Sequence, residues 1–316
     1  MEGPYIQQPE LRVWERRSIA GELQLLDCSN FEIELPSLDP AELARREALR
    51  PIRRRRGQSQ PEPYSLPWFL EIERHRYTRP GSSLPYLLEF RKHAGETVLG
   101  LGSLLGTDLV QYALNDCRLI VANASAELLT LSKRNLQLRG LSARCVQAGV
   151  DLPLPSSSID VVYLDALATP LAQPRAWADE IFRVLKPGGK IVSLWPARYN
   201  VAYWESIFFP WQRLFHRVPA VNPHSQTSYS LRQIFEQFTE HRTHKRHLRR
   251  SELPHLWRWQ PLVLLERLMG QLLVFKAFKP LSTARIHAVN GQVNGQVNGQ
   301  PGGHANGHPS SVHTPA

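Results

Sequence analysis

The sequence lacks several features that would place it in a special class of protein. It has only three cysteines, Cys28, Cys117 and Cys145, an odd number without a CxxC pair, which argues against a disulfide framework and a zinc site. No apolar run approaches the roughly 20 residues needed to cross a bilayer, and the start, MEGPYIQQPELRVWERR, lacks the apolar centre of a secretory signal. We therefore expect a cytoplasmic protein without a membrane span or a metal. The hydrophobic share of 42% over 316 residues is enough for a buried core.

Acidic residues are also relatively few. The chain has 28 aspartates and glutamates and 38 lysines and arginines, which gives a formal net charge of +10. Much of the excess lies in two runs, Arg53–Arg56 and His241–Arg250. Neither run alternates with aromatic residues, as a stacking platform for single-stranded nucleic acid would. We interpret them as a solvated linker and a solvated helix or strand face. Nucleic-acid binding is the less favoured alternative, which a strong dependence of affinity on salt would reveal.

Composition divides the chain into three parts. Residues 1–60 form an N-terminal extension with a charged helix and a linker; the helix begins at Pro40, and Asp39 is a suitable N-cap. Residues 281–316 carry an Asn-Gly-Gln-Val repeat, which cannot bury a core and predicts a disordered tail. Between them, residues 61–280 have the pattern of a folded domain.

Strand and helix patterns alternate through this central domain. The predicted strands are 98–101, 119–122, 143–147, 161–164, 190–195 and 272–277, and the predicted helices are 108–114, 126–139, 175–185 and 230–238. Strands that alternate with helices pair in parallel and are covered by helices on both faces. We therefore predict a doubly wound, mostly parallel α/β sheet.

The first predicted strand runs into a glycine turn, VLGLGSLLGTD, at residues 98–108. In an open α/β sheet the ligand binds at the carboxyl ends of the strands, where such a turn enters a helix N-terminus. Gly102 and Gly106 are suited to positive φ and to a close approach of the backbone. The GxGxxxG spacing alone also fits a nicotinamide-dependent oxidoreductase, but Asn123, after the second strand, is not the ribose-binding acid that such a site needs.

Further segments follow the turn in a characteristic order: LLTLSKRNLQLRG at 128–140, LPLP at 152–155, SIDVVY at 158–163, and EI and RVLKPGGK at 180–190. With these segments the sequence resembles the type 11 branch of the class I S-adenosylmethionine-dependent methyltransferases, from about Glu71 to Lys279. The resemblance implies a Rossmann-type methyltransferase domain over 61–280, with S-adenosylmethionine as the cofactor. It places the methionine part of the cofactor near the first turn, the ribose after the second strand and the adenine after the third.

On this resemblance the cofactor-binding residues would be Gly100, Gly102, Gly106, Asp108, Asn123, Gly149 and Val150. Several of these positions depart from the family pattern, which has an acid at Gly100, a glycine at Leu104 and an acid at Asn123. The family's Gly-Asp after the third strand corresponds to Ala148-Gly149, and its two histidines after the fourth strand correspond to Thr169 and Pro170.

The departures differ in how strongly each is expected to weaken cofactor binding. Asn123 offers a neutral acceptor where the family has a charge-assisted one, which weakens binding about tenfold. Leu104 places a branched side chain where backbone and cofactor should nearly touch. We therefore expect an eroded cofactor site in which binding is weak or lost.

Two functions follow from this reading. The first is a methyltransferase that acts on an unidentified small-molecule acceptor, contacted by Arg74, Arg76 and Tyr77 and by the aromatic segment after Asn200. In that case Asp165, after the fourth strand, is the candidate general base, and its alternative role is a helix cap or a solvated loop acid. The second function is a non-catalytic protein of the same fold that serves as a binding or scaffolding subunit for a protein partner.

Overall fold

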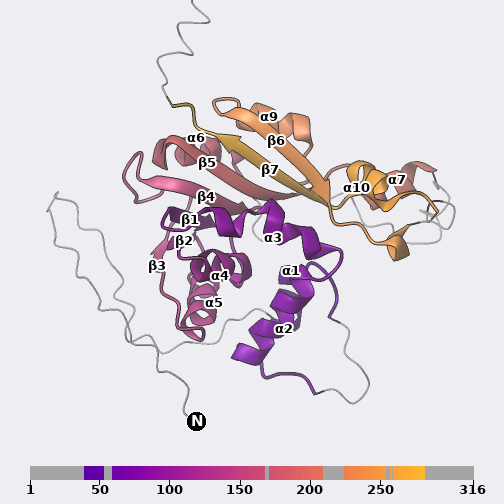
Figure 1. Ribbon diagram of the computed structural model, residues 1–316, viewed down its shortest axis with the longest axis horizontal. Coiled ribbons are helices and arrows are strands. Elements are labelled where there is room, and N and C mark those ends of the chain that lie inside the picture. Colours follow the sequence, from indigo (N-terminus) through magenta and orange to yellow (C-terminus); the bar gives the residue numbers. More distant parts are fainter. Residues whose placement is uncertain are drawn as a thin grey trace, which may run out of the picture. The chain divides into compact units, whose positions relative to one another are not determined.

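The computed structural model describes residues 39–52, 59–167, 171–208, 224–253, 257 and 259–281 (Figure 1). The chain divides into two compact units, Met1–Glu34 and Leu35–Ala316, and every described residue belongs to the second. The expectations for Arg53–Arg56, for Thr169 and Pro170 and for the tail after residue 281 lie outside the described residues.

The described part of the chain contains one sheet of seven strands in the order β3-β2-β1-β4-β5-β7-β6. The strands are β1 (Thr97–Leu101), β2 (Arg118–Asn123), β3 (Arg144–Gln147), β4 (Ile159–Asp165), β5 (Leu185–Pro196), β6 (Thr239–Arg246) and β7 (Leu272–Phe278). The neighbours from β3 to β5 are parallel, whereas β7 runs antiparallel to both β5 and β6. The predicted doubly wound, mostly parallel sheet is confirmed.

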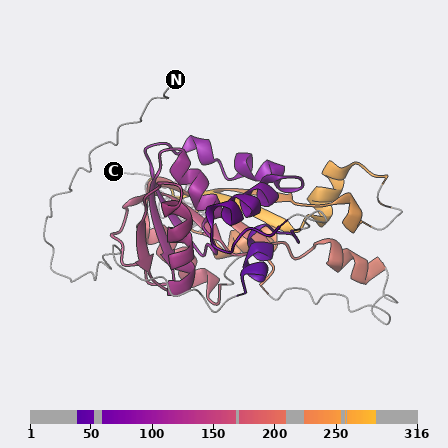
Figure 2. The ribbon, with the colours of Figure 1, turned by 90° about the horizontal axis from the view of Figure 1, so that it is seen from below.

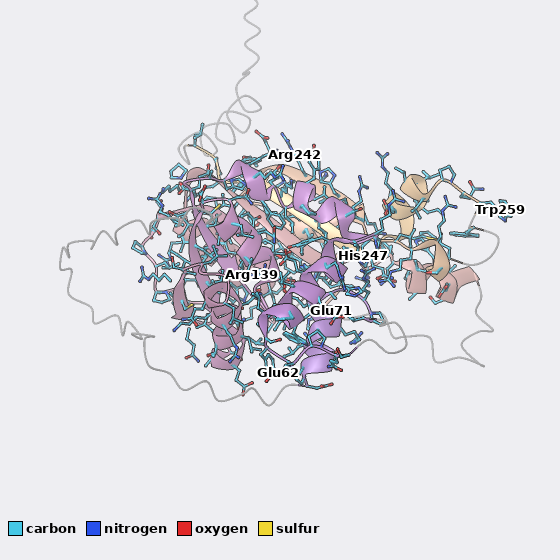
Figure 3. The ribbon with its side chains drawn as sticks, turned by 60° about the horizontal axis from the view of Figure 1, so that its bottom comes forward. Glu62, Glu71, Arg139, Arg242, His247 and Trp259 are labelled. Atoms are coloured by element: carbon cyan, nitrogen blue, oxygen red, sulfur yellow. The ribbon has the colours of Figure 1, made fainter. Side chains whose placement is uncertain are left out.

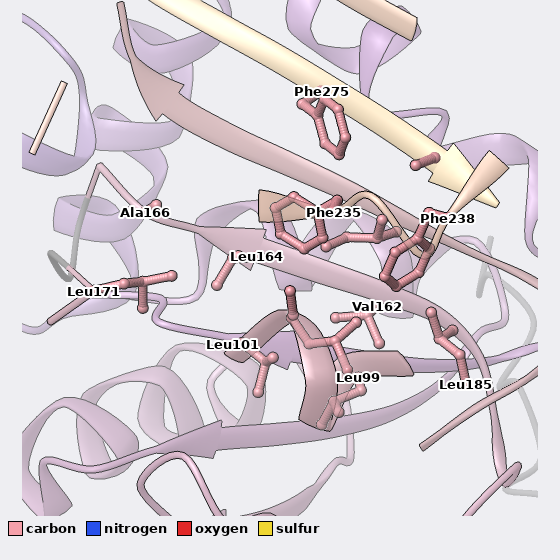
Figure 4. Close-up of a cluster of buried hydrophobic side chains, with 14 of the residues drawn as sticks. Leu99, Leu101, Val162, Leu164, Ala166, Leu171, Leu185, Phe235, Phe238 and Phe275 are labelled. Atoms are coloured by element: carbon pink, nitrogen blue, oxygen red, sulfur yellow. The ribbon is translucent and has the colours of Figure 1, made fainter. Parts of the chain in front are cut away.

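Helices cover both faces of this sheet because alternate residues of its central strands are apolar on both sides. On one face, α6 (Pro174–Val184) and α9 (Ser228–Ile234) pack over Leu99, Val162 and Phe275 (Figure 4). On the other face lie α3 (Leu84–Leu87), α4 (Thr107–Leu114) and α5 (Ala126–Gln137). Figure 1 shows the two helical layers on opposite sides of the strands.

Two helices at the N-terminal side of the domain pack together. They are α1 (Pro40–Glu47) and α2 (Leu66–Tyr77), and they share an apolar cluster with the glycine turn and α5. The predicted start of α1 is confirmed, since the Asp39 side chain accepts a hydrogen bond from the Ala41 N–H at 3.0 Å and Pro40 is the first helical residue.

A second pair of helices, α7 (Val201–Phe208) and α10 (Leu262–Met269), shares a small cluster that includes Val201, Leu265 and Met269. Figures 1 and 2 both show this pair beyond one end of the sheet. Short 3₁₀ turns, Gly81–Ser83, Phe90–Lys92 and Arg250–Glu252, connect the remaining elements. None of the helices in the described ranges has the length and apolar character that crossing a bilayer takes.

The basic run His241–Arg250, predicted as a solvated helix or strand face, is mostly part of the strand β6. This strand pairs only with β7 among the described strands, so it forms an edge of the sheet. Charged side chains on an edge strand oppose pairing with another chain, which accounts for a strand of this composition. The run is less solvated than predicted, because His244 and Lys245 are half-buried.

Candidate active site at the glycine turn

The glycine turn joins β1 to α4 at the carboxyl edge of the sheet. Gly102 and Gly106 have φ of 71° and 73°, so the prediction of positive φ at both is confirmed. A Cβ atom at Gly106 would also lie 3.2 Å from Cβ of Ser132 on α5. The backbone therefore turns tightly here and presents the N-terminus of α4 to the space beyond the strands, which favours binding of an anionic group.

A carboxylate of the chain itself occupies this helix N-terminus. Oε1 of Glu47, at the end of α1, accepts a hydrogen bond from the N–H of Thr107, the first residue of α4, at 3.0 Å. The Glu47 side chain is only 2% exposed, and its other oxygen, Oε2, has no hydrogen-bond partner in the described structure. Sequence reasoning missed Glu47. The available signal was an acid on the same side of α1 as the apolar residues Leu43 and Ala44.

Asp108 lies in the centre of a buried network that joins α2, α4 and β4. Its Oδ1 accepts from Nε of Arg76 at 2.9 Å and from the hydroxyl of Tyr77 at 2.7 Å. Its Oδ2 accepts from Nη2 of Arg76 and from the hydroxyl of Tyr163. Asp108 is a predicted cofactor-binding residue, and other residues of the protein already donate hydrogen bonds to both of its carboxylate oxygens.

Electrostatics keep the guanidinium of Arg76 charged and the hydroxyls of Tyr77 and Tyr163 protonated. Burial works against the charge of Arg76, but the carboxylates of Asp108 and Glu47 outweigh it and hold the pKa of Arg76 well above its ordinary value. Burial, and then the charge of Asp108, raise the pKa of Tyr77 and of Tyr163 well above the ordinary value, so both hydroxyls remain donors. Arg76 is 1% exposed, and the hydroxyl of Tyr77 donates to Asp108. The contact of these two residues with a substrate stays a prediction.

Leu104 lies inside the apolar cluster formed by α1, α2, α5 and the turn. Only 2% of the residue is exposed, and the cluster includes Leu43, Trp68, Phe69 and Leu128. The branched side chain therefore points into the packing beneath the N-terminal helices. The sequence alone could not give this direction, because it depends on how α1 and α2 dock.

Asn123 lies at the end of β2, and both the nitrogen and the oxygen of its side-chain amide form hydrogen bonds. Its Nδ2 donates to the carbonyl of Ser103 at 2.8 Å, and its Oδ1 accepts from the N–H of Ser125 at 3.0 Å. Asn123 thus ties β2 to the glycine turn. Gly149 and Val150, in contrast, border solvent: Gly149 is exposed, and a Cβ atom there would meet nothing within 4 Å.

Gly100 is a close-packing position in β1. A Cβ atom on Gly100 would lie 2.3 Å from Cδ2 of Leu109 on α4, and Leu109 is fully buried. An acid of the family type could not be placed here unless Leu109 moved. Glycine at this position therefore lets α4 pack closely against the sheet.

Asp165, the candidate general base, is 3% exposed at the end of β4. Its Oδ1 accepts from the N–H of Leu167 at 3.0 Å, and its Oδ2 lies 3.6 Å from Nη2 of Arg76. A carboxylate held by an arginine and by its own loop is better suited to positioning Arg76 than to taking up a proton. In the described ranges no group of three or more His, Cys, Asp or Glu residues is arranged to hold a metal ion.

Two features define the site. One is the strand order, in which the antiparallel β7 lies between β5 and β6. The other is the glycine turn at the carboxyl edge of the sheet. Residues 99–193 match the family model of the methyltransferase domain. This domain belongs to the class I S-adenosylmethionine-dependent methyltransferase family. The match covers the turn and the ends of β2 and β4, and it ends within β5.

One curated relative is similar to part of this domain. Demethylmenaquinone methyltransferase of Clavibacter sepedonicus is 32% identical over 99 residues, which are 31% of this chain and 40% of that protein. The chain thus matches less than half the length of this curated relative.

Two solved structures also align with the chain. A SAM-dependent methyltransferase from Aquifex aeolicus aligns with a TM-score of 0.46 and 14% identity over 77% of this chain and 99% of its own. Geranyl diphosphate C-methyltransferase from Streptomyces coelicolor A3(2) aligns with a TM-score of 0.45 and 16% identity over 69% of this chain and 83% of its own.

Proposed function

We propose that the chain is an S-adenosylmethionine-dependent methyltransferase for a small-molecule acceptor, with a donor site that its own side chains weaken. The donor, when bound, supplies an activated methyl group. Under this proposal the positive-φ glycines Gly102 and Gly106 bring the backbone close to its methionine part. Gly149 and Val150, which border solvent, would lie beside its adenine.

The observation that carries the proposal is Glu47 at the N-terminus of α4. A donor that brings its own carboxylate to this helix end would meet a second, buried carboxylate, which already accepts the Thr107 N–H. Like charges in a desolvated site repel each other strongly. Glu47 therefore opposes the anionic part of the donor, and the Asn123 amide, held by Ser103 and Ser125, adds only a neutral contact.

The test is a calorimetric titration of the full chain with S-adenosylmethionine and S-adenosylhomocysteine. We expect weak binding by the unaltered chain and an affinity about tenfold higher for Glu47→Gln, because the amide keeps the size of the side chain and removes its charge. Glu42→Gln, on the exposed face of the same helix, is the matched control and should leave the affinity unchanged.

Two outcomes would overturn the proposal. Tight binding by the unaltered chain would show that the site is intact, and a fall in affinity for Glu47→Gln would mean that Glu47 holds the donor's ammonium group.

A second candidate function is a non-catalytic binding or scaffolding subunit. It is favoured by Asn123, whose side-chain amide is already hydrogen-bonded to Ser103 and Ser125 at the predicted ribose position. A ligand that binds only the native state must raise its stability. Absence of both heat and thermal stabilisation at millimolar donor, in the unaltered chain and in Glu47→Gln, would select this second function.

A further inference from the structure

A separate pocket lies at the same edge of the sheet as the glycine turn. Its volume is about 490 Å³, within the range of small-molecule sites. It is lined by the loop after α2, by the end of β6 with the segment that follows it, and by α10. The polar residues from the first two stretches are Arg79, Ser82, Ser83, Arg246, Arg249 and Arg250.

The strand register gives the place of the pocket. Arg246, the last residue of β6, pairs with Leu272 of β7, and Leu272 pairs with Pro196, the last residue of β5. The segment after β6 therefore lies at the carboxyl edge, where ligands of open α/β sheets bind. Figure 3 labels Arg242, within β6, and His247, the first residue after β6.

The charge of the lining is strongly one-sided. Four arginines line the pocket, against a single carboxylate, Glu266 of α10. The guanidinium of Arg79 makes no hydrogen bond or ion pair with the described residues, and its carbonyl accepts from Nη1 of Arg50 at 3.2 Å. Arg50 thus adds a fifth guanidinium behind the loop, and its Nε is buried without a hydrogen-bond partner in the described structure.

His247 lies between the lining residues Arg246 and Leu248, and the positive charge near it affects its pKa. It is 3% exposed, and its Nδ1 has no hydrogen-bond partner among the described residues. Burial, together with the charges of Arg249, Arg76 and Arg50, lowers the pKa of His247 to about 4. Burial and the charge of Arg249 also lower the pKa of Arg50. The lowered pKa values of His247 and Arg50 both indicate that positive charge is concentrated around this pocket.

We propose that this pocket binds the phosphate or diphosphate group of a small phosphorylated molecule. Planar guanidinium groups match phosphate oxygens in pairs, and the hydroxyls of Ser82 and Ser83 add neutral donors. Pro80, Leu248 and Leu262 form an apolar part of the wall, which suits the organic portion of such a molecule. This site is independent of the proposed donor site, since none of its lining residues belongs to the glycine turn.

The test is a titration of the full chain with inorganic diphosphate at constant ionic strength. We expect one binding site per chain, and an affinity lowered about tenfold or more by Arg79→Gln and by Arg246→Gln, because each removes a charge-assisted contact. Arg79 is exposed, so we expect its variant to keep the fold. Arg267→Gln, on the exposed face of α10 and outside the pocket, is the matched control and should bind diphosphate like the unaltered chain.

Four results would overturn the proposal: no binding of diphosphate, equal binding by all three variants, tighter binding of citrate than of diphosphate, or tighter binding of a single-stranded oligonucleotide with the same arginine dependence. The citrate result would assign a carboxylate ligand, and the oligonucleotide result a nucleic acid. Diphosphate binding that persists in Glu47→Gln, whatever that variant does to donor binding, separates this proposal from the proposed function.

Discussion

His247 shows how one buried residue couples stability to pH. Its pKa is lowered to about 4 from an ordinary value of 6.5, so between these values the unfolded chain binds more protons than the folded one. The stabilising contribution is therefore complete above about pH 6.5 and is lost as the pH falls toward 4. We expect a loss of about 2 kcal/mol in unfolding free energy between pH 6.5 and 4.5 from this residue.

Urea unfolding of the unaltered chain and of His247→Gln at these two pH values checks the prediction. The variant should lose about 2 kcal/mol less than the unaltered chain on acidification. Equal losses would show that the imidazole is protonated in the folded state.

Gly100 and Gly149 form a matched pair for testing the glycine positions. Gly100→Ala should destabilise the fold by about 1–3 kcal/mol, because its new methyl group would overlap Leu109. Gly149→Ala, with open space around it, should change stability by no more than about 0.5 kcal/mol.

Thermal and urea unfolding of both variants measure the difference. Adding Leu109→Ala to Gly100→Ala should cost less than the sum of the two single changes, since the smaller side chain leaves room for the methyl group. An additive double variant would argue against the close packing of α4 on β1.

At the level of elements, the ion pair between Arg76 and Asp108 connects α2 to α4, and Tyr163 extends the connection to β4. Removing one partner leaves the other charge buried without compensation, which costs about 3–5 kcal/mol. We therefore expect Arg76→Met to destabilise the domain by this amount in equilibrium unfolding. Replacing both partners, as Arg76→Met with Asp108→Leu, should recover part of the loss.

An exposed pair is the control for this prediction. Arg45 and Glu42 on α1 lie 2.6 Å apart, but about half of each side chain is exposed. Arg45→Met should cost less than about 1 kcal/mol. A similar cost for Arg76→Met and Arg45→Met would mean that the network at Asp108 contributes little to the docking of α2.

At the level of the whole molecule, β6 forms an edge of the described sheet, and an edge strand favours pairing with another chain unless its side chains oppose it. Arg242 is an exposed charge on this edge, next to a register shift between Thr239 and Arg242. Both features oppose pairing of β6 with another chain. Arg242→Ile should therefore raise the apparent mass in light scattering at high protein concentration.

Arg232→Ile, on α9, makes the same change in charge and hydrophobicity at an exposed helical site. It should leave the apparent mass unchanged. Association of both variants to the same extent would point to loss of net charge, not to the strand edge, as the cause.

The sequence predicted most of the sheet correctly because apolar periodicity is a local property. The strands β1, β2, β4, β5 and β7 contain buried apolar runs, which can be recognised in the sequence without knowledge of a partner strand. β6 was harder to assign, since its residues TEHRTHKR carry no apolar alternation and its strand form depends on pairing with β7. The family resemblance identified candidate site residues from their positions in the motifs. It could not predict which side chains of other elements would contact them.

What the sequence by itself determined is therefore the order of strands and helices, the capped start of α1 and the glycines that take positive φ, since each depends on a few adjacent residues. Only the tertiary structure decided that Glu47 reaches the N-terminus of α4, that Arg76 is buried against Asp108, and that several arginines gather at one pocket. These residues lie far apart along the chain, and their contacts depend on how α1, α2 and β6 pack against the sheet. Packing buries them, and in a buried site the charge of each neighbour decides what a residue can bind.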